Sequence, residues 1–505
     1  MNFLGKQIGL LALGFSLFFC QNSKPANYQF LSPALKISLA PFLLRVNSAE
    51  SLATTSNEDY ELNQSGLITA RTLSSMASNW QTQKPSGITG KLVVLQIQGS
   101  STTPSQKFVP SNESQGVYSY LVTTPSSALE TSLFGQTRNN GLIDTETLVP
   151  DGRTADAFLE NYGIHPGRDL IVFAMDTETS SNLWNALRGY YALRYWGVNA
   201  PNLAVLNGSV DANQSRGELL TTSARNTSVR REFVSVKTLN NDNTILQATI
   251  ADVQHIVLSG NTTFEKVTPL PASTPVFLDA RRPNEFKPSG LQTPAGTGKS
   301  CSSQFNSSCR IPIEGAISGA VNLPWNGSNT SFTDGFVNNG SSSANTIDLR
   351  FKTKASISEL LRSQGIERNG SQVISYCRTA VRAMVPFFAT NAIVGYPSRV
   401  YDGSWIEWSQ FSTRTNDNDP NWTNLNSSSP WRTNRSNLTQ NLYLNPAATS
   451  IPTINIPTVQ AFSRSANSII DADKAYLRAT SGSQNTTTSP SGGGATGGGG
   501  NACGS

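Results

Sequence analysis

The chain has 505 residues, of which 14% are charged and 37% hydrophobic, and its formal net charge is +5. This length suggests about two to four domains, which bury ordinary cores without disulfide bonds. The charge is small for the length and forms no concentrated basic run, so nucleic acid is excluded as a predicted partner. The scarcity of charges and the abundance of Ser, Thr and Asn favour the polar surface of an extracytoplasmic protein.

The N-terminal segment has the pattern of an export signal. Lys6 is followed by an apolar stretch over residues 8–19 and then by Cys20. A stretch of about a dozen residues is too short to span a bilayer stably and fits the core of a signal peptide. With Leu17 three residues before Cys20, residues 1–20 resemble a bacterial lipoprotein signal. The resemblance implies a periplasmic or outer-membrane lipoprotein, anchored by a lipid on Cys20. An uncleaved anchor and ordinary secretion are the alternatives, and both also export the chain.

Residues 21–60 form a polar leader, after which apolar runs alternate with helix-like segments. Strand-like runs of the first half lie at Gly66–Thr69, Leu92–Leu95, Ile171–Asp176 and Ala204–Gly208. Helix-like segments lie at Leu183–Trp196 and Ile357–Gln364. This alternation predicts an α/β fold with mainly parallel sheets flanked by helices, and a cleft at the carboxyl ends of the strands. We place one domain at residues 61–215 and a second at residues 230–412, joined by a polar connector.

One cysteine of the second half lies on a short loop with two arginines. The apolar run Val373–Ser375 leads into a segment in which Cys377 precedes Arg378 and Arg382. The thiolate is the reactive form of cysteine, and nearby cations and helix N-terminal amides stabilise it. Residues from Ala383 onward are compatible with a helix, so the strand, loop and helix order needed to cradle an anion is present. The alternative is a packed, inert thiol.

Three further blocks of the second half frame this loop. Pro275–Arg281 reads as a buried strand that ends in an acid and a base, Gly315–Trp325 follows it, and Tyr401–Trp408 closes the segment. In this order around a C-x-x-x-x-R loop, the blocks resemble the catalytic domain of rhodanese-type sulfurtransferases.

The first half resembles the first domain of tandem rhodaneses. Its four strand-like runs are joined by two further blocks, Phe158–Ile164 and Leu193–Gly197. Asp176 follows the central strand where the second copy carries Cys377. A carboxylate cannot accept a sulfane sulfur, so the resemblance implies a non-catalytic first copy that packs against the second. The predicted fold class is therefore α/β with two rhodanese-like domains, followed by an irregular C-terminal extension and a Gly-rich tail.

The resemblance implies a thiosulfate sulfurtransferase that needs no cofactor. Cys377 as thiolate takes the outer sulfur of thiosulfate or a similar small anion, and the persulfide passes it to a thiol or cyanide. Arg281, Arg378 and Arg382 hold the oxyanion end of the donor, and Asp279 orients the loop through hydrogen bonds. The loop residues whose backbone amides stabilise the charged sulfur include Thr379, Ala380 and Val381.

Two residues depart from the family pattern, since Ala380 replaces a usual Gly and Ala316 replaces a usual His. Two functions from other classes therefore stay open. The domain could bind or carry sulfur, or selenium and tellurium species, without turnover, or it could be a structural surface lipoprotein. The presence of Cys377 together with Arg281 and Arg382 argues against the purely structural case.

The second half also contains a pair of cysteines, Cys301 and Cys309, in a Ser-, Thr- and Gly-rich insertion. An oxidising compartment favours a disulfide between them, and two free thiols are the alternative. The chain has only two histidines, His165 and His255, neither of them near these cysteines in the sequence. We therefore predict no metal site.

The C-terminal part is poor in folding signals. The extension at residues 413–480 is rich in Asn, Pro, Ser and Thr, with one short helix expected over residues 466–478. The Gly-rich tail at residues 481–505 cannot hold a fold. It carries Cys503, which either resolves the persulfide of Cys377 as a thiol on a flexible arm or is an incidental thiol.

Overall fold

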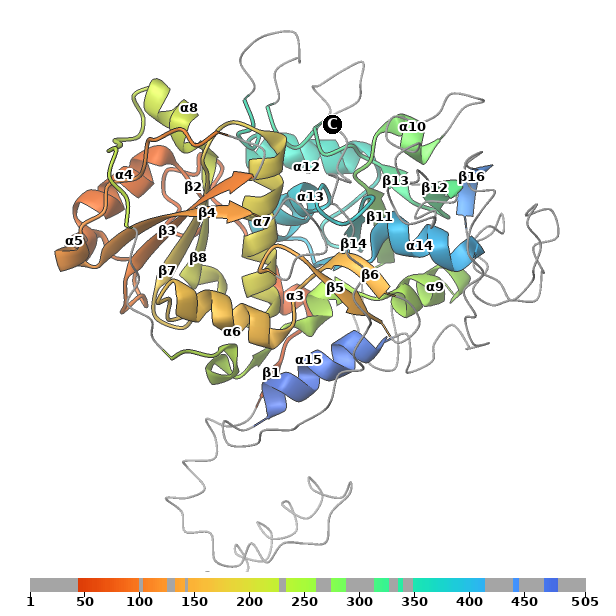
Figure 1. Ribbon diagram of the computed structural model, residues 1–505. Coiled ribbons are helices and arrows are strands. Elements are labelled where there is room, and N and C mark those ends of the chain that lie inside the picture. The colour runs from red at the N-terminus through yellow and green to blue at the C-terminus, as the bar shows by residue number, and fades with distance from the viewer. Residues whose placement is uncertain are drawn as a thin grey trace, which may run out of the picture. The chain divides into compact units, whose positions relative to one another are not determined.

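The architecture is mixed α/β, built around two five-stranded parallel sheets (Figure 1). The protein is seen in a computed structural model that describes residues 44–99, 103–124, 132–140, 144–226, 233–259, 274–287, 313–326, 335–338, 348–413, 439–444 and 467–479. The predicted fold class of mainly parallel sheets flanked by helices is confirmed. From Arg45 onward the described chain forms one compact unit. Each sheet falls within one predicted domain range, 61–215 or 230–412, and those boundaries stay a prediction.

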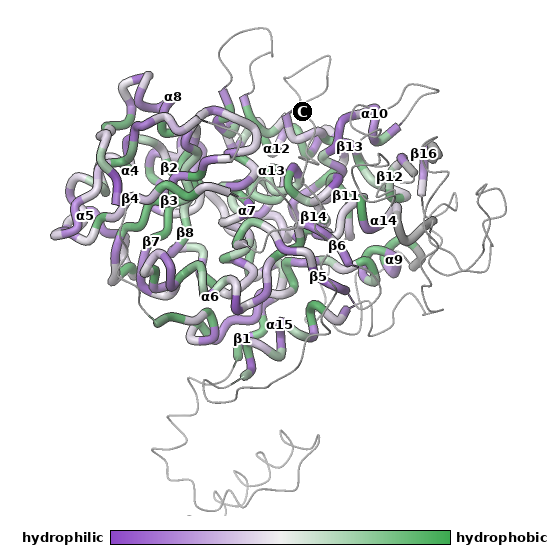
Figure 2. The backbone as a smooth tube through the Cα atoms, viewed as in Figure 1, coloured by the Kyte–Doolittle hydropathy of each residue, from purple (hydrophilic) through white to green (hydrophobic). Residues whose placement is uncertain are grey.

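The first sheet lies in the N-terminal half, and all its strand pairs are parallel. In spatial order its strands are β2 (Gly66–Ile68), β8 (Leu203–Ser209), β7 (Leu170–Met175), β3 (Leu92–Gly99) and β4 (Val117–Thr124). The strand β7 reads Leu-Ile-Val-Phe-Ala-Met and is buried throughout, as expected for a parallel strand covered on both faces. Figure 2 shows the hydrophobic stretch along β3. The four strand-like runs predicted here are confirmed.

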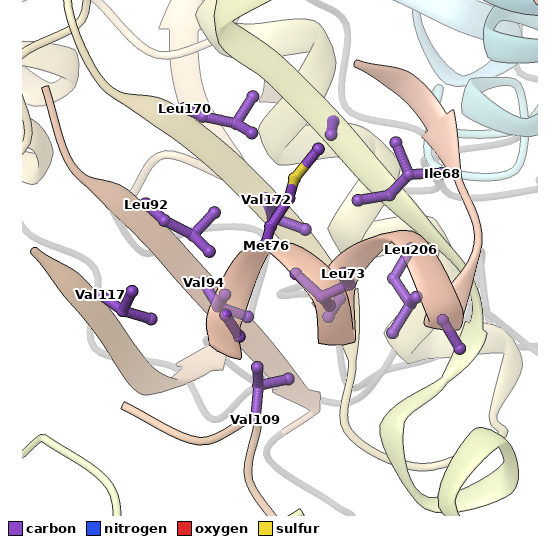
Figure 3. Packing of buried hydrophobic residues seen from close by; sticks show 14 of the residues in the cluster. Ile68, Leu73, Met76, Leu92, Val94, Val109, Val117, Leu170, Val172 and Leu206 are labelled. Carbon is purple, nitrogen blue, oxygen red and sulfur yellow. The ribbon is translucent and has the colours of Figure 1, made fainter. Parts of the chain in front are cut away.

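Helices flank the first sheet, and polar caps mark where several of them begin. They are α4 (Ala70–Ser78), α5 (Trp80–Gln83), α6 (Gly152–Asn161), α7 (Ser180–Tyr195) and α8 (Val210–Ser215). Thr69, Asp151 and Thr179 each accept a hydrogen bond from the backbone N–H three residues later, which satisfies a donor that the helix leaves unpaired. From α4, Leu73 and Met76 pack into a buried apolar cluster with residues of β3, β7 and β8 (Figure 3).

The second sheet repeats this arrangement, again with parallel strand pairs. In spatial order its strands are β10 (Gln247–Ala248), β15 (Ser398–Tyr401), β14 (Ser371–Tyr376), β11 (Thr274–Asp279) and β13 (Val321–Asn322). Its helices are α9 (Ile250–Ser259), α10 (Pro283–Phe286), α12 (Lys354–Ser363), α13 (Met384–Phe388) and α14 (Ser404–Thr413). The helix expected over residues 357–364 begins earlier, because Thr353 caps it by accepting the backbone N–H of Ser356. The strand β14 is the middle one of the five, so its carboxyl end lies at the centre of the sheet edge.

The helix α7 joins the two halves and is buried along most of its length. The rings of Tyr190 on α7 and Phe388 on α13 meet edge to face with centroids 4.9 Å apart, a favoured aromatic geometry. Arg188 of α7 donates to both carboxylate oxygens of Asp402, and both side chains are fully buried. The apolar and ionic contacts of α7 therefore hold the first sheet and the second half together.

Shorter elements complete the described fold. They are β1 (Arg45–Val46), α3 (Ala49–Leu52), η3 (Glu113–Gln115), β5 (Gln136–Asn139), β6 (Asp144–Leu148), η4 (Ala200–Asn202), η5 (Val236–Leu239), β9 (Asn241–Asp242), η6 (Thr244–Leu246), β12 (Ile313–Ile317), η9 (Ala389–Ile393), β16 (Thr439–Leu444) and α15 (Ser468–Arg478). The pair β1 and β9 is parallel, whereas β5 with β6 and β12 with β16 are antiparallel.

The described part of the C-terminal extension is more regular than predicted for residues 413–480. The strand β16 pairs with β12 of the second half, and the helix expected over residues 466–478 is confirmed as α15. From α15, Asp473 accepts hydrogen bonds from Arg138 and Tyr195 of the first half. Both β16 and α15 contact residues that lie far away in the sequence. Composition alone could therefore not reveal that these two elements are ordered.

The two ends of the chain lie outside the described residues. These ends include residues 1–43, with the predicted signal and Cys20, and residues 480–505, with Cys503. In the described part, no helix combines the length and the hydropathy that a membrane span requires. Export, lipidation and the role of the tail therefore stay predictions.

Candidate active site at Cys377

Cys377 lies directly after β14, at the carboxyl end of the middle strand of the second sheet. Its side chain is buried, with 1% exposed. The backbone N–H of Cys377 donates to the Ser404 hydroxyl at 3.3 Å, and the backbone N–H of Trp405 donates to the Cys377 carbonyl at 3.0 Å. The first turn of α14 therefore fixes the start of the cysteine loop.

Two residues near the thiol adopt a left-handed backbone conformation that side chains disfavour. Ala380 in the loop has φ +60°, and Ser404 at the start of α14 has φ +52°. This region costs roughly 1–2 kcal/mol for a residue with a Cβ atom, whereas glycine enters it freely. The Gly expected at position 380 from the family resemblance is thus explained. With Ala380 the loop keeps its left-handed conformation at some cost in strain.

Arg281 is held by acceptors of the protein on all sides of its guanidinium. Its Nη2 donates to Asp279 at 2.7 Å, and its Nη1 donates to Glu314 at 3.0 Å. The guanidinium carbon also lies 4.4 Å from the ring centroid of Trp405, within the range of a cation–π contact. Arg281, Asp279 and Glu314 are all fully buried. A donor anion held by Arg281, as the sequence predicted, would share this buried guanidinium with Asp279 and Glu314.

Arg378 and Arg382 are paired with carboxylates in the same way. The Nη2 atom of Arg378 lies 2.9 Å from Glu314 Oε1 and 3.1 Å from Glu285 Oε1. Arg382 donates to both oxygens of Glu285, at 2.8 and 2.9 Å. Together with Asp279 and Arg281, these residues form a chain of alternating charge, which we call the ion-pair chain. Its order is Asp279, Arg281, Glu314, Arg378, Glu285 and Arg382.

The two glutamates of the ion-pair chain differ in their pKa. Burial raises the pKa of Glu285, but the guanidiniums of Arg382 and Arg378 outweigh burial and hold it well below its usual range. Burial raises the pKa of Glu314 to about 7, although Arg378 and Arg281 oppose the rise. Glu314 therefore gains a proton more readily than Glu285.

The sequence predicted the thiol and the arginines but missed Glu285, Glu314 and Ser404. Glu285 stands four residues after Arg281, and Glu314 stands directly before the Gly315–Trp325 block. The sequence offered one signal for Glu314, which is a single charged residue directly before an apolar block. The pairing itself could not be predicted, because Glu314 and Arg378 are 64 residues apart in the sequence.

The remaining predicted site residues lie in the cysteine loop or outside the described residues. Thr379 and Val381 are buried in the cysteine loop. Cys301 and Cys309 lie outside the described residues, so their pairing is not described. Within the described ranges, no group of His, Cys, Asp and Glu side chains could hold a metal ion.

Asp176 lies in the first half at the end of a central strand, and its role in a non-catalytic first copy stays a prediction. Asp176 follows β7 and is fully buried. Its carboxylate accepts hydrogen bonds from Gln96 at 2.5 Å and from the Ser105 hydroxyl at 2.8 Å. These hydrogen bonds satisfy the buried polar oxygens of Asp176 and hold its side chain in place.

A cleft at Cys377 stays a prediction. Two cavities lined by described residues lie elsewhere, one beside Asp242 and Arg399 and the other beside Glu61 and Arg350. Cys377 lines neither of them.

Comparison with known proteins places a family match on this site. Residues 266–411 match the family model described as a rhodanese-like domain. A candidate thiosulfate sulfurtransferase of Haloferax volcanii is 32% identical over 138 residues, which are 26% of this chain and 37% of that protein. A candidate thiosulfate sulfurtransferase, SseB, of Mycobacterium tuberculosis is 26% identical over 269 residues, 53% of this chain and 72% of that protein. The chain thus spans little more than a third of the Haloferax protein.

The solved structures that this chain resembles show low identity to it and TM-scores below 0.5. The anaerobic ergothioneine biosynthesis enzyme of Chlorobium limicola is 15% identical with a TM-score of 0.46, over 72% of this chain and 70% of that one. The SseA protein of Escherichia coli, described as a 3-mercaptopyruvate sulfotransferase with the rhodanese fold, is 16% identical with a TM-score of 0.41, over 68% of this chain and 99% of that one.

The cysteine loop at the carboxyl end of the middle strand of the second sheet thus lies inside residues 266–411, which match the rhodanese-like domain. Its relatives include distant homologues named for thiosulfate sulfurtransferase activity.

Proposed function

We propose that this protein moves a sulfane sulfur from thiosulfate or a similar donor to a thiol or cyanide, through a persulfide on Cys377. The observation that carries the proposal is the position of Cys377 after β14, within the residues that match the rhodanese-like domain. The names of the distant relatives agree with it.

The proposed reaction has two half-reactions that balance without a cofactor. In the first, the Cys377 thiolate attacks the outer sulfur of thiosulfate, a new sulfur–sulfur bond forms, and sulfite leaves with the electron pair of the broken bond. In the second, a thiolate or the carbon of cyanide attacks the outer sulfur of the persulfide, and Cys377 leaves as a thiolate. Each half-reaction transfers one neutral sulfur atom, so no outside oxidant is needed.

The roles of the surrounding residues follow from their contacts. Ser404 and the first turn of α14 hold the backbone of Cys377. Arg378 and Arg382 hold the loop through Glu314 and Glu285. We propose that the backbone amides of the loop stabilise the charged sulfur, because preorganised donors act strongly in a site shielded from water.

The test is an assay with purified protein, thiosulfate and cyanide, in which thiocyanate is followed over time. We expect turnover by the wild type and none by Cys377→Ser. Mass spectrometry after thiosulfate treatment should find one added sulfur, about 32 Da, on the Cys377 peptide. The control Cys309→Ser makes the same change at another cysteine and should keep both results. Added sulfur on Cys301 or Cys309 instead of Cys377 would contradict the assignment of Cys377 as the sulfur-carrying residue.

A second candidate function is a carrier that binds sulfur, or selenium and tellurium species, without turnover. The burial of Cys377 and the pairing of its neighbouring arginines with carboxylates favour this case over an open catalytic cleft. A carrier would take up sulfur on Cys377 from thiosulfate but would not pass it to cyanide, so mass spectrometry would find the added sulfur while the same assay would form no thiocyanate.

We also propose export and anchoring through a lipid on Cys20, on the basis of the N-terminal sequence. Labelling of cells with a fatty acid analogue should mark the wild-type protein and leave Cys20→Ser unmarked. Equal labelling of both proteins would refute the anchor.

A further inference from the structure

Glu314 occupies the centre of the ion-pair chain, and the local fold of β12 directs it there. The pairing of β12 with β16 shifts in register between Glu314 and Ala316. Gly315 at this shift has φ +143°, and a Cβ on it would lie 2.7 Å from the Gln440 carbonyl oxygen. A β-bulge of this kind changes the direction in which a neighbouring side chain points, and such bulges are common beside active sites. Here the Glu314 side chain is fully buried and meets Arg281 and Arg378.

When all three of its carboxyl groups are ionised, the ion-pair chain carries no net charge beside the thiol loop. Three carboxylates, those of Asp279, Glu285 and Glu314, alternate with three guanidiniums. Glu314 binds two of these guanidiniums, at 2.9 and 3.0 Å. Carboxylates and sulfur oxyanions bind guanidinium through the same charge-assisted hydrogen bonds. A thiosulfate dianion that approaches the Nη2 atom of Arg378 must therefore displace a carboxylate that is already in place.

We propose that Glu314 acts as an internal competitor of anionic donors and thereby selects the donor, favouring a monoanionic or neutral alkyl persulfide over the thiosulfate dianion. This inference rests on the proposed function of Cys377 and deepens it. The Cys377 thiolate attacks the outer sulfur of the persulfide R–S–SH, and the bond between the two donor sulfurs breaks. The alkyl thiolate leaves with the electron pair and takes a proton from water. Such a donor needs no cation for a sulfonate group, so the neutral ion-pair chain does not oppose it.

The first test measures binding alone, so that it does not depend on turnover. Thiosulfate is titrated calorimetrically into Cys377→Ser and into Cys377→Ser with Glu314→Gln. Freeing a guanidinium for one charged hydrogen bond should tighten thiosulfate binding about tenfold or more. The control Glu359→Gln removes an exposed carboxylate of α12 that pairs with Arg362, and it should leave the affinity unchanged. Unchanged or weaker binding in the Glu314→Gln protein would overturn the proposal.

The second test compares two donors with the active thiol in place. With Glu314→Gln, kcat/KM for thiosulfate should rise about tenfold through a lower KM. The value for 2-hydroxyethyl persulfide should change less than about twofold. A parallel change for both donors would show that Glu314 only supports the loop. If no donor loads Cys377 in any of these proteins, the proposed function fails, while the binding titration still decides the role of Glu314.

The third test covers the case in which Glu314→Gln does not fold. The charged groups that face Glu314 are Arg281, Arg378, Asp279 and Glu285. Because the pKa of Glu314 is raised to about 7, lowering the pH through neutrality removes its charge and releases the guanidiniums. Thiosulfate should therefore bind the Cys377→Ser protein more tightly at about pH 6 than at about pH 8. An affinity that does not change with pH would overturn the proposal.

Discussion

Arg382 is held by both of its terminal nitrogens, which donate to the two carboxylate oxygens of Glu285 at 2.8 and 2.9 Å. Both side chains are nearly buried. Removing one partner of a buried ion pair costs about 3–5 kcal/mol, because the remaining charge is left without compensation. We predict that Arg382→Ala lowers the free energy of unfolding, measured by urea denaturation, by an amount near the lower end of this range. Arg378 still contacts Glu285 at 3.1 Å and limits the loss.

The matched control for this prediction is Arg362→Ala. Arg362 pairs with Glu359 on α12, and both side chains are more than half exposed. Exposed pairs contribute about 0–1 kcal/mol, so this variant should stay close to the wild type. Similar losses for Arg362→Ala and Arg382→Ala would show that the buried pair adds nothing special to stability.

At the scale of single residues, the sequence placed Cys377 on one loop with two arginines but did not reveal the carboxylates that pair with those arginines. Cys377, Arg378 and Arg382 lie within one short segment, so their proximity follows from the chain itself. Arg281 and Glu314 are 33 residues apart, with an insertion between them. Only the folded sheet brings such residues together, and a sequence pattern contains no information on the distance between them.

At the scale of elements, the helix α14 carries a buried carboxyl group whose protonation couples stability to pH. Glu407 accepts hydrogen bonds from Asn140 at 2.6 Å and from Thr145 at 3.1 Å. Burial raises its pKa from 4.5 to about 7. Between these two pH values the folded protein keeps a proton on Glu407 that the unfolded chain releases. Stability is therefore greatest below the unfolded pKa and falls as the pH rises towards the folded pKa.

We predict that Glu407→Gln reduces this decline, because an amide does not titrate and its oxygen still accepts the same hydrogen bonds. Urea denaturation between about pH 5 and about pH 8 should show a flatter dependence for the variant than for the wild type. Part of the decline should remain, since the pKa of Glu314 is raised in the same direction. Parallel curves for the two proteins would show that Glu407 does not titrate differently in the folded state.

The elements that could be predicted are those with long apolar runs. The strand β7 is buried at every position, so its sequence identified it without reference to a partner. The short pairs β5 with β6 and β12 with β16 were not predicted, because their residues are mixed in polarity and each pair contains a register shift. Such strands are stabilised by pairing with a partner strand, and their own sequences show no clear strand pattern.

At the scale of the whole described molecule, the C-terminal extension contributes to both halves. The strand β16 pairs with β12, the strand that carries Glu314 of the ion-pair chain. The helix α15 packs on the first half near α6 (Figure 1). The Tyr476 hydroxyl donates to Asp156 of α6, and Lys474 pairs with Asp242 of β9 at 3.0 Å. The extension was expected to be irregular because its composition is polar. Its order comes from a few specific contacts, which a composition cannot predict.

We predict that Asp473 is the main anchor of α15. Its carboxylate accepts two hydrogen bonds from Arg138, at 2.6 and 2.9 Å, and one from the Tyr195 hydroxyl at 2.6 Å, and its side chain is buried. Asp473→Asn keeps the shape but removes the charge that Arg138 faces. Hydrogen exchange of the α15 amides should then speed up by about tenfold or more, the equivalent of about 1.4 kcal/mol, while β7 keeps its protection. Asp471→Asn makes the same change at an exposed position of the same helix and should have little effect. If both variants leave the exchange of α15 unchanged, apolar contacts such as those of Leu477 hold the helix, and the ion pair is secondary.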